Sequence, residues 1–116
     1  MLTRDNAVAR LLEALPEYQP AWDEITDLQG ELLLHVMMGD LARFYMREYK
    51  QRDVRERFWR VVEELAADGD QYVENAVHVS LIEWFAWGSP EEVRAMDDAR
   101  ELHGPATRAI RAHYAS

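Results

Sequence analysis

The chain contains no cysteine among its 116 residues. Disulfide bonds, catalysis by a thiolate and zinc sites built on cysteine are therefore excluded together. Lysine is nearly absent as well, because twelve of the thirteen basic residues are arginine and only Lys50 is lysine. Such an arginine preference is typical of bacterial genomes rich in G and C, and the lack of cysteine is compatible with a reducing cytosol.

Long apolar runs are also missing. The longest, residues 32–38, is interrupted by His35 and is far shorter than the roughly 20 residues that a membrane span needs. The polar N-terminus leads directly into a helical pattern, so we expect no signal peptide and a cytoplasmic protein. The sequence has no nucleophile elbow, no phosphate-binding glycine-rich loop and no Cys/His ligand set. We therefore predict neither enzymatic activity nor a cofactor.

Acidic residues outnumber basic ones by 22 to 13, which gives a net charge of −9 at pH 7. A charge of this sign repels phosphate groups, so we expect neither nucleic acid nor an anionic membrane as a partner. It suits a basic protein partner, or simply keeps the protein in solution.

Apolar residues recur with the period of an amphipathic helix along nearly the whole chain. Segments 31–51 and 71–87 are apolar over most of their circumference, which is typical of helices at the centre of a domain. The β-branched residues of 71–87 would also fit a strand, but its length and its lack of alternation favour a helix. We predict an all-α fold, a compact bundle of six to seven helices around these two segments, with 1–116 as a single domain.

Local signals predict where several helices begin and end. Thr3 is expected to cap a first helix that Pro16 stops, and Pro20 to open a second helix that ends at Gly30. Asp53 is expected to cap a helix over residues 54–67.

Two glycine-containing boundaries divide the C-terminal part. Gly88, Ser89 and Pro90 can close one helix, cap the next and begin it, while Gly104-Pro105 separates a last helix. Within segment 31–51, Gly39 costs about 1 kcal/mol relative to alanine. We expect a closely packed neighbouring helix, or a kink, to explain it.

Charge is segregated along the chain. Residues 11–42 and 61–92 contain seven and eight acids and no Lys or Arg, whereas residues 43–60 carry seven bases and three acids. The basic block can pair with the flanking acids inside the molecule, at about 0–1 kcal/mol per exposed pair. Alternatively, the acidic excess forms a surface that attracts a basic partner and speeds association. Because the flanking acids outnumber the bases, we expect many of them to remain unpaired.

The two central segments contain His35, Asp40, His78 and Glu83. Each histidine lies five residues from its acid, a spacing that does not place two metal ligands on one helix face. A metal or acid–base site across both helices is the alternative, but we favour polar residues hydrogen-bonded within the bundle and predict no metal ligands. The residues predicted to be buried polar groups are His35, Asp40, Arg43, Ser80 and Glu83, with Asp40 and Arg43 expected to pair.

Three aromatic residues, Trp84, Phe85 and Trp87, crowd the end of segment 71–87. Core packing accounts for most of them. They cannot all point inward, so we expect Trp87 to be exposed, and exposed tryptophan is a common anchor at protein interfaces.

Three short segments resemble a family of small helical bacterial proteins of uncharacterised function, associated with the immunity proteins of toxin systems: HVMMGDLARF (35–44), VSLIEWF (79–85) and LHGPATR (102–108). The resemblance covers about residues 5–114. Its most distinctive parts are the Gly39-Asp40 pair and the run from Val79 and Ser80 to Glu83. It implies an all-α fold and a non-enzymatic role, and it carries over no catalytic residue.

Charge and resemblance together suggest an immunity-type protein that binds and neutralises a basic toxin domain such as a nuclease. Acidic side chains would cover the basic cleft of the toxin, and Trp87 would anchor the contact. The predicted partner-binding residues are Asp23, Glu24, Asp27, Glu31, Glu63, Glu64, Asp70, Glu74 and Trp87. One alternative is a helical adaptor or regulatory module with another protein partner. The other is an enzyme or metal protein that uses His35, Asp40, His78 and Glu83.

Overall fold

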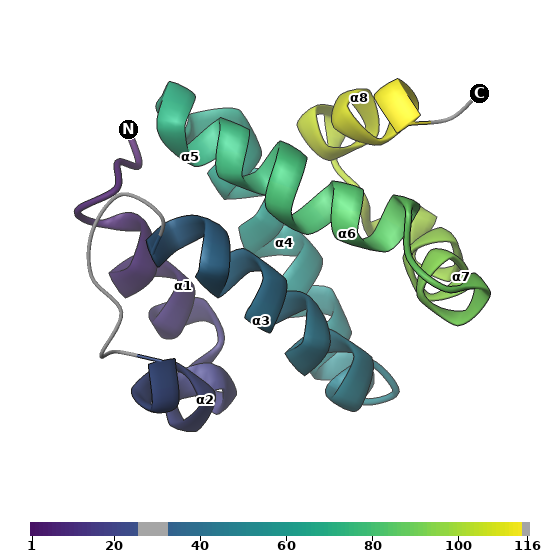
Figure 1. Cartoon of the computed structure of the whole chain (residues 1–116), viewed down its shortest axis with the longest axis horizontal. Coiled ribbons are helices and arrows are strands. Elements are labelled where there is room, and N and C mark those ends of the chain that lie inside the picture. Colours follow the sequence, from purple (N-terminus) through teal and green to yellow (C-terminus); the bar gives the residue numbers. More distant parts are fainter. Residues whose placement is uncertain (26–32, 115–116) are drawn as a thin grey trace.

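Proline residues set the helix boundaries near the N-terminus. The computed structural model describes residues 1–25 and 33–114 (Figure 1). Helix α1, Ala7–Ala14, ends before Pro16, where the 3-10 turn η1, Pro16–Tyr18, leads into α2, Gln19–Ile25. Pro20 lies in the first turn of α2, as predicted, whereas the predicted end at Gly30 lies outside the described residues.

Helix α1 begins four residues after Thr3, later than the sequence predicts. Thr3 instead opens a turn, in which its amide donates to Asn6 Oδ1 at 2.6 Å and its carbonyl accepts from the Ala7 amide at 2.8 Å. Asn6, without a side-chain hydrogen bond to the helix, occupies the cap position.

Helix α3, Leu33–Glu48, with helix α4, Arg52–Asp68, behind it, and the helix of residues 71–86 form the centre of the bundle (Figure 1). Helices α3 and α4 are joined by a short turn. Figure 1 shows α3 running alongside the green helix that contains α5 and α6, with α4 behind them. The described part of the predicted segment 31–51 is thus a central helix, and it buries seven side chains: Leu34, Met37, Met38, Leu41, Ala42, Phe44 and Tyr45.

The prediction that Asp53 caps α4 is wrong. The helix begins at Arg52 with Gln51 at its cap, so Asp53 already lies in the first turn. There Asp53 Oδ2 accepts from Arg57 Nη2 at 2.7 Å, while Arg57 Nη1 donates to the Ala14 carbonyl at 3.1 Å. The carboxylate stays at the positive end of the helix dipole but is used to orient an arginine that ties α4 to the end of α1.

The second central helix runs from residue 71 to 86 and is called the 71–86 helix below. It consists of α5, Gln71–Ala76, a π-helical segment η2, Val77–Ile82, and α6, Glu83–Ala86. Asp70 caps it, because Asp70 Oδ1 accepts from the Val73 amide at 2.9 Å. In the π-helical segment the Glu83 amide donates to the His78 carbonyl, five residues back. The sequence predicts this helix and its extent, but not its wide turn.

The predicted boundary at Gly88, Ser89 and Pro90 is confirmed. Ser89 Oγ accepts from the Glu92 amide at 3.2 Å, and Glu92 Oε1 accepts from the Ser89 amide at 2.7 Å, a reciprocal capping box. Helix α7, Pro90–Asp98, is followed by the 3-10 turn η3, Arg100–Leu102, and after Gly104 by α8, Pro105–Tyr114.

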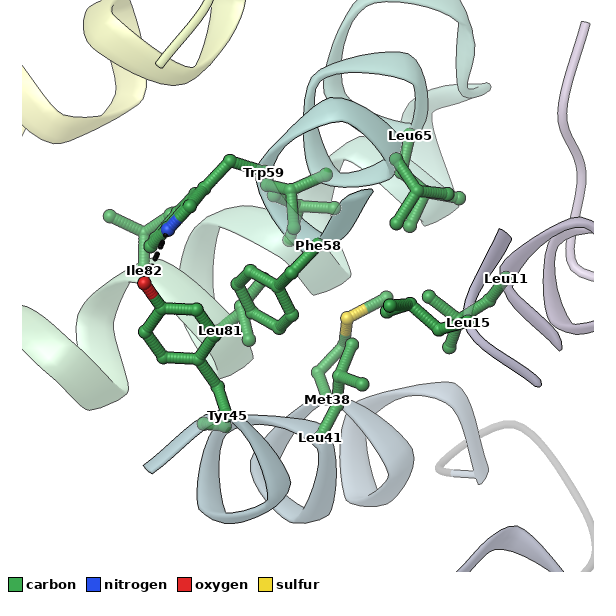
Figure 2. Packing of buried hydrophobic residues seen from close by; sticks show 14 of the residues in the cluster. Leu11, Leu15, Met38, Leu41, Tyr45, Phe58, Trp59, Leu65, Leu81 and Ile82 are labelled. Carbon is green, nitrogen blue, oxygen red and sulfur yellow. Dashed lines mark hydrogen bonds between the residues drawn. The ribbon is translucent and has the colours of Figure 1, made fainter. Parts of the chain in front are cut away.

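An aromatic cluster fills the core where α3, α4 and the 71–86 helix meet (Figure 2). Tyr45, Phe58, Trp59 and Phe85 are fully buried, and the ring centroids of Tyr45 and Phe58 lie 4.3 Å apart. Trp59 Nε1 donates to the Tyr45 hydroxyl at 2.8 Å, so the two polar atoms in this cluster satisfy each other. Burial raises the pKa of the Tyr45 hydroxyl to about 12, which keeps it neutral.

Gly39 has no close neighbour among the described residues. A Cβ placed on Gly39 would meet none of their atoms within 4 Å outside its own helix backbone. The expectation that a closely packed helix requires this glycine is therefore wrong.

The all-α prediction is confirmed. Counting the 71–86 helix as one, the described residues form seven α-helical rods in a compact bundle. In this part of the chain, none of the helices combines the length and the apolar character that a membrane crossing needs.

Candidate functional site

Two of the predicted partner-binding acids hold the bundle together. Glu63 accepts from the amides of Ala106 and Thr107 at 3.0 and 2.9 Å, and so caps α8 from α4. Burial acts to raise the pKa of Glu63, but these amide hydrogen bonds outweigh it and keep the pKa below its usual value. Glu64 receives Nε and Nη2 of Arg10, both at 2.7 Å, in a bidentate pair. Both carboxylates are thus engaged inside the molecule.

The other predicted acids lie on different helices. Asp23 and Glu24 are exposed on α2, Glu74 is exposed on α5, and Asp70 is the cap of α5. Asp27 and Glu31 lie outside the described residues. The acids are therefore distributed over the bundle, and their role in binding a partner stays a prediction.

Among the described residues the basic block forms few ion pairs, fewer than the interpretation that it neutralises its acidic flanks predicts. Of its seven cations, only Arg52 and Arg57 form ion pairs among the described residues. The other five are Arg43, Arg47, Lys50, Arg55 and Arg60. Arg43 is also exposed, so neither its predicted burial nor its pairing with Asp40 is found. Asp40 instead accepts from the Tyr18 hydroxyl at 2.8 Å, which links α3 to η1.

The remaining predicted polar residues make separate contacts. His35 Nδ1 lies 2.6 Å from Ser80 Oγ, which joins α3 to the π-helical segment. Glu83 Oε2 accepts from the Tyr114 hydroxyl at 3.2 Å, which joins α6 to α8. The alternative site of His35, Asp40, His78 and Glu83 is therefore not assembled. In the described ranges, no three His, Asp or Glu side chains are grouped so that they could hold a metal ion.

A groove of about 550 Å³ opens beside the contact between His35 and Ser80. We call it the Trp87 groove. Its walls come from α3, the π-helical segment, α6, the turn that follows and the first turn of α7. It is lined by His35, Val79, Ser80, Glu83, Trp84, Trp87, Gly88 and Glu92. The groove therefore contains Trp87, one of the predicted partner-binding residues, and three of the predicted buried polar residues. His35, Ser80 and Glu83 are half-buried at its edge, so the prediction that they are buried is not confirmed.

The wide turn of the 71–86 helix aligns the groove wall. Val79, Glu83 and Trp87 follow one another at intervals of four residues. In a regular α-helix, four residues overshoot one turn by about 40°, so such a row winds around the helix. A π-helical turn takes more residues and compensates for this drift. The row therefore stays on one side, and the buried row Val73, Val77, Leu81 and Phe85 stays on the other.

The Trp87 groove is acidic and aromatic. Glu83 and Glu92 line it, and no Lys or Arg is among its lining residues. Trp87 is 70% exposed, as predicted, and its ring lies edge to face with Tyr114 at a centroid distance of 5.5 Å. Trp84 is half-buried and stands at 85° to Phe85. Burial, and then the charge of Glu83, raise the pKa of Tyr114, so its hydroxyl remains a donor to that carboxylate.

His35 and Ser80 lie within hydrogen-bond distance, as a nucleophile and its base would, but the described residues supply no third group that completes such a site. A catalytic histidine needs a third group that orients its second ring nitrogen, together with donors for an oxyanion. His35 Nδ1 faces Ser80, and no hydrogen bond orients Nε2 from the described residues. The ring instead meets the edge of Tyr72 at a centroid distance of 5.7 Å. The contact therefore joins two helices.

A second hollow, of about 490 Å³, lies beside α4 and is lined by Glu56, Arg60, Glu63, Glu64, Ala67, Asp68, Leu102 and Gly104. Each of its carboxylates has a partner within the molecule. Glu56 pairs with Arg52 at 2.9 Å, and Asp68 lies 3.9 Å from the N-terminal amine. We therefore take the Trp87 groove, whose acids form no ion pair within the described part of the chain, as the candidate functional site.

Sequence reasoning missed two further histidine environments. His103 is buried against Trp59 at a centroid distance of 4.3 Å, and neither ring nitrogen has a partner in the described structure. Burial, assisted by the charge of Arg111, lowers the pKa of His103 to about 4. The rings of His78 and His113 lie 5.0 Å apart beside Tyr114. Neither environment has a local sequence signal, because each joins segments far apart in the chain.

A family model described as "Domain of unknown function (DUF7674)" matches residues 8–114. None of the curated proteins or solved structures compared with the chain matches it. The resemblance to a family of unknown function is confirmed in this form, and the match does not bear on toxin immunity.

Proposed function

We propose that this protein, which belongs to the family of the Domain of unknown function (DUF7674), binds a basic protein partner in the Trp87 groove. The description of the family names no function, so the groove is the best guide to one. The observation that carries the proposal is the combination of two tryptophans and two carboxylates in an open groove whose lining contains no cation. Tryptophan is enriched at the energetic centres of interfaces, and uncompensated acids favour a partner of opposite charge.

Exposed apolar side chains favour a protein rather than a small metabolite as the partner. Trp87, Val36 and Val79 are the large apolar residues exposed after the N-terminal methionine in the described part, at 70%, 39% and 39%. Trp87 and Val79 both line the groove. An aromatic side chain that remains in water at the edge of a hollow gains most when a second surface covers it.

The net charge of −9 also favours a basic partner. A negative surface raises the association rate of a positive partner, and salt reduces this effect. Exposed acids on other helices, such as Glu24 and Glu74, contribute to the field without touching the partner.

Photo-crosslinking in the native cell tests the proposal. A photoreactive phenylalanine derivative in place of Trp87 should crosslink one basic protein, and the same residue in place of the exposed Arg100, outside the groove, should not. The purified partner should then bind about tenfold or more weakly at 500 mM than at 50 mM salt. An acidic partner, or equal crosslinking from both positions, would refute the proposal.

Neutralisation of a toxin is the finer form of the proposal, motivated by the sequence resemblance. It predicts that the crosslinked partner stops growth when expressed alone, and that co-expression of this protein restores growth. The Trp87→Ala variant should restore it less well. A partner that is harmless when expressed alone would instead identify the protein as an adaptor or regulatory module.

A further inference from the structure

We infer that the Trp87 groove recognises an arginine side chain of the basic partner, a choice of ligand that rests on the proposed function. Glu83 and Glu92 both line the groove, but each has only one of its carboxylate oxygens occupied. Glu83 Oε2 accepts from the Tyr114 hydroxyl at 3.2 Å, and Glu92 Oε1 accepts from the Ser89 amide at 2.7 Å. The second oxygen of each carboxylate has no hydrogen-bond donor among the described residues.

These internal hydrogen bonds hold the carboxylates in place before a ligand arrives. Glu92 is fixed by the capping box of α7, and Glu83 by its contact with the last helix. A group already held in position loses less conformational freedom on binding, so more of the interaction energy appears as affinity. The groove therefore presents two negative acceptors at fixed places on neighbouring elements.

The aromatic part of the groove suits a flat cation. Guanidinium groups stack on the faces of aromatic rings, and tryptophan gives the strongest such interaction. Trp87 is largely exposed, and Tyr114 contacts it edge to face at 87°, which holds the ring without stacking on it. A guanidinium group at this ring would lie in the same groove as the carboxylate of Glu83.

Arginine fits this site better than lysine. Its planar guanidinium has five donors and can stack on a ring while it donates to carboxylates, whereas the lysine ammonium is compact and strongly hydrated. The groove holds about 550 Å³, enough for an arginine side chain together with neighbouring residues of its chain.

The test uses the full chain and three N-acetylated tripeptide amides, Gly-Arg-Gly, Gly-Lys-Gly and Gly-citrulline-Gly. Tryptophan fluorescence and calorimetry measure binding up to about 10 mM peptide, a range that covers weak single-residue contacts. The arginine peptide should bind about fivefold or more tightly than the lysine peptide, and the uncharged citrulline peptide should not bind measurably. Free arginine amide is measured in the same way. If it binds as tightly as the arginine peptide, the proposal that the bound arginine belongs to a protein is overturned.

Matched variants locate the binding. Glu83→Gln keeps an acceptor for Tyr114 but removes the charge, and it should weaken binding of the arginine peptide about tenfold. Glu91→Gln removes an exposed carboxylate that does not line the groove, and it should change binding less than twofold. Circular dichroism melting of both variants checks that they fold alike.

Equal binding of the arginine and lysine peptides, equal binding of the citrulline peptide, or equal losses in the two variants would each overturn the arginine assignment. The same is true if no arginine-dependent change appears at about 10 mM. None of these results contradicts the proposed function if a basic protein still crosslinks at position 87. The proposed function fails separately, when crosslinking finds no basic partner.

Discussion

Replacement of Gly104 by alanine should destabilise the protein through a residue 41 positions earlier in the chain, Glu63. A Cβ on Gly104 would lie 2.5 Å from Glu63 Cγ and 2.6 Å from Oε1. Contacts this short do not occur in folded proteins, so the side chain must move. The carboxylate normally accepts from the amides of Ala106 and Thr107, and movement breaks that cap of α8.

The size of the effect follows from these contacts. Two hydrogen bonds to a charged acceptor contribute about 1.5 kcal/mol each, or about 3 kcal/mol together. The substitution also lowers the conformational entropy of the unfolded chain, which favours the folded state by about 0.4–1 kcal/mol. Alanine can adopt the backbone conformation at this position, because Gly104 does not have a positive φ. We expect Gly104→Ala to lower the free energy of unfolding by about 2 kcal/mol.

A double-mutant cycle isolates the cause. In the Glu63→Ala background no carboxylate remains to be displaced, so Gly104→Ala should there be neutral or stabilise by up to about 1 kcal/mol. Urea unfolding of the four proteins, followed by circular dichroism at 222 nm, gives the coupling energy. If Gly104→Ala costs the same in both backgrounds, its effect does not pass through Glu63.

Two further predictions concern single residues. Gly39→Ala should raise the free energy of unfolding by about 0.5–1 kcal/mol in the same urea assay, because a Cβ there meets no neighbour and alanine favours the helix. A loss of stability would show that the helix needs glycine. The second concerns His103, which stays neutral down to a pKa of about 4 in the folded protein, whereas an unfolded histidine binds a proton near pH 6.5. The unfolded state therefore gains protons first as the pH falls, and stability should decrease by about 1–2 kcal/mol between pH 7 and pH 5, which is the part of the linkage that falls above the folded pKa. His103→Gln should flatten this part of the curve, and an unchanged slope would contradict the assignment.

The sequence predicted features that depend on local patterns. The capping box at Ser89 lies within four residues, so its chemistry is visible in the sequence. The central positions of α3 and the 71–86 helix follow from how much of each helix surface is apolar. The exposure of Trp87 follows from the crowding of aromatic residues at one helix end.

The sequence did not predict contacts between distant segments. Glu64 pairs with Arg10, 54 residues away, and Asp40 bonds to Tyr18 rather than to the nearby Arg43. Counting charges along the chain could not show which acids would be used inside the bundle. The candidate groove was missed for the same reason, because α3 and the turn before α7 contribute to it from different parts of the chain.

The spacing of the buried residues in the 71–86 helix is one local signal for its wide turn. The buried residues of this helix are Val73, Ala76, Val77, Leu81, Ile82 and Phe85. The intervals from Ala76 to Leu81 and from Val77 to Ile82 are five residues, whereas the buried face of a regular α-helix repeats at intervals of three and four. An interval of five between buried positions indicates a helix that must incorporate an additional residue in one turn to keep one face inward.

The π-helical segment Val77–Ile82 also has a consequence for chain length. Removal of one residue from it would allow an uninterrupted α-helix that keeps the parts before and after the deletion on their present faces, because the wide turn holds the additional residue. Phe85 would stay in the interior and Trp87 in the groove. Family members that are one residue shorter here should therefore keep the same groove, whereas a one-residue difference elsewhere in the 71–86 helix would turn everything beyond it by about 100° and present other side chains.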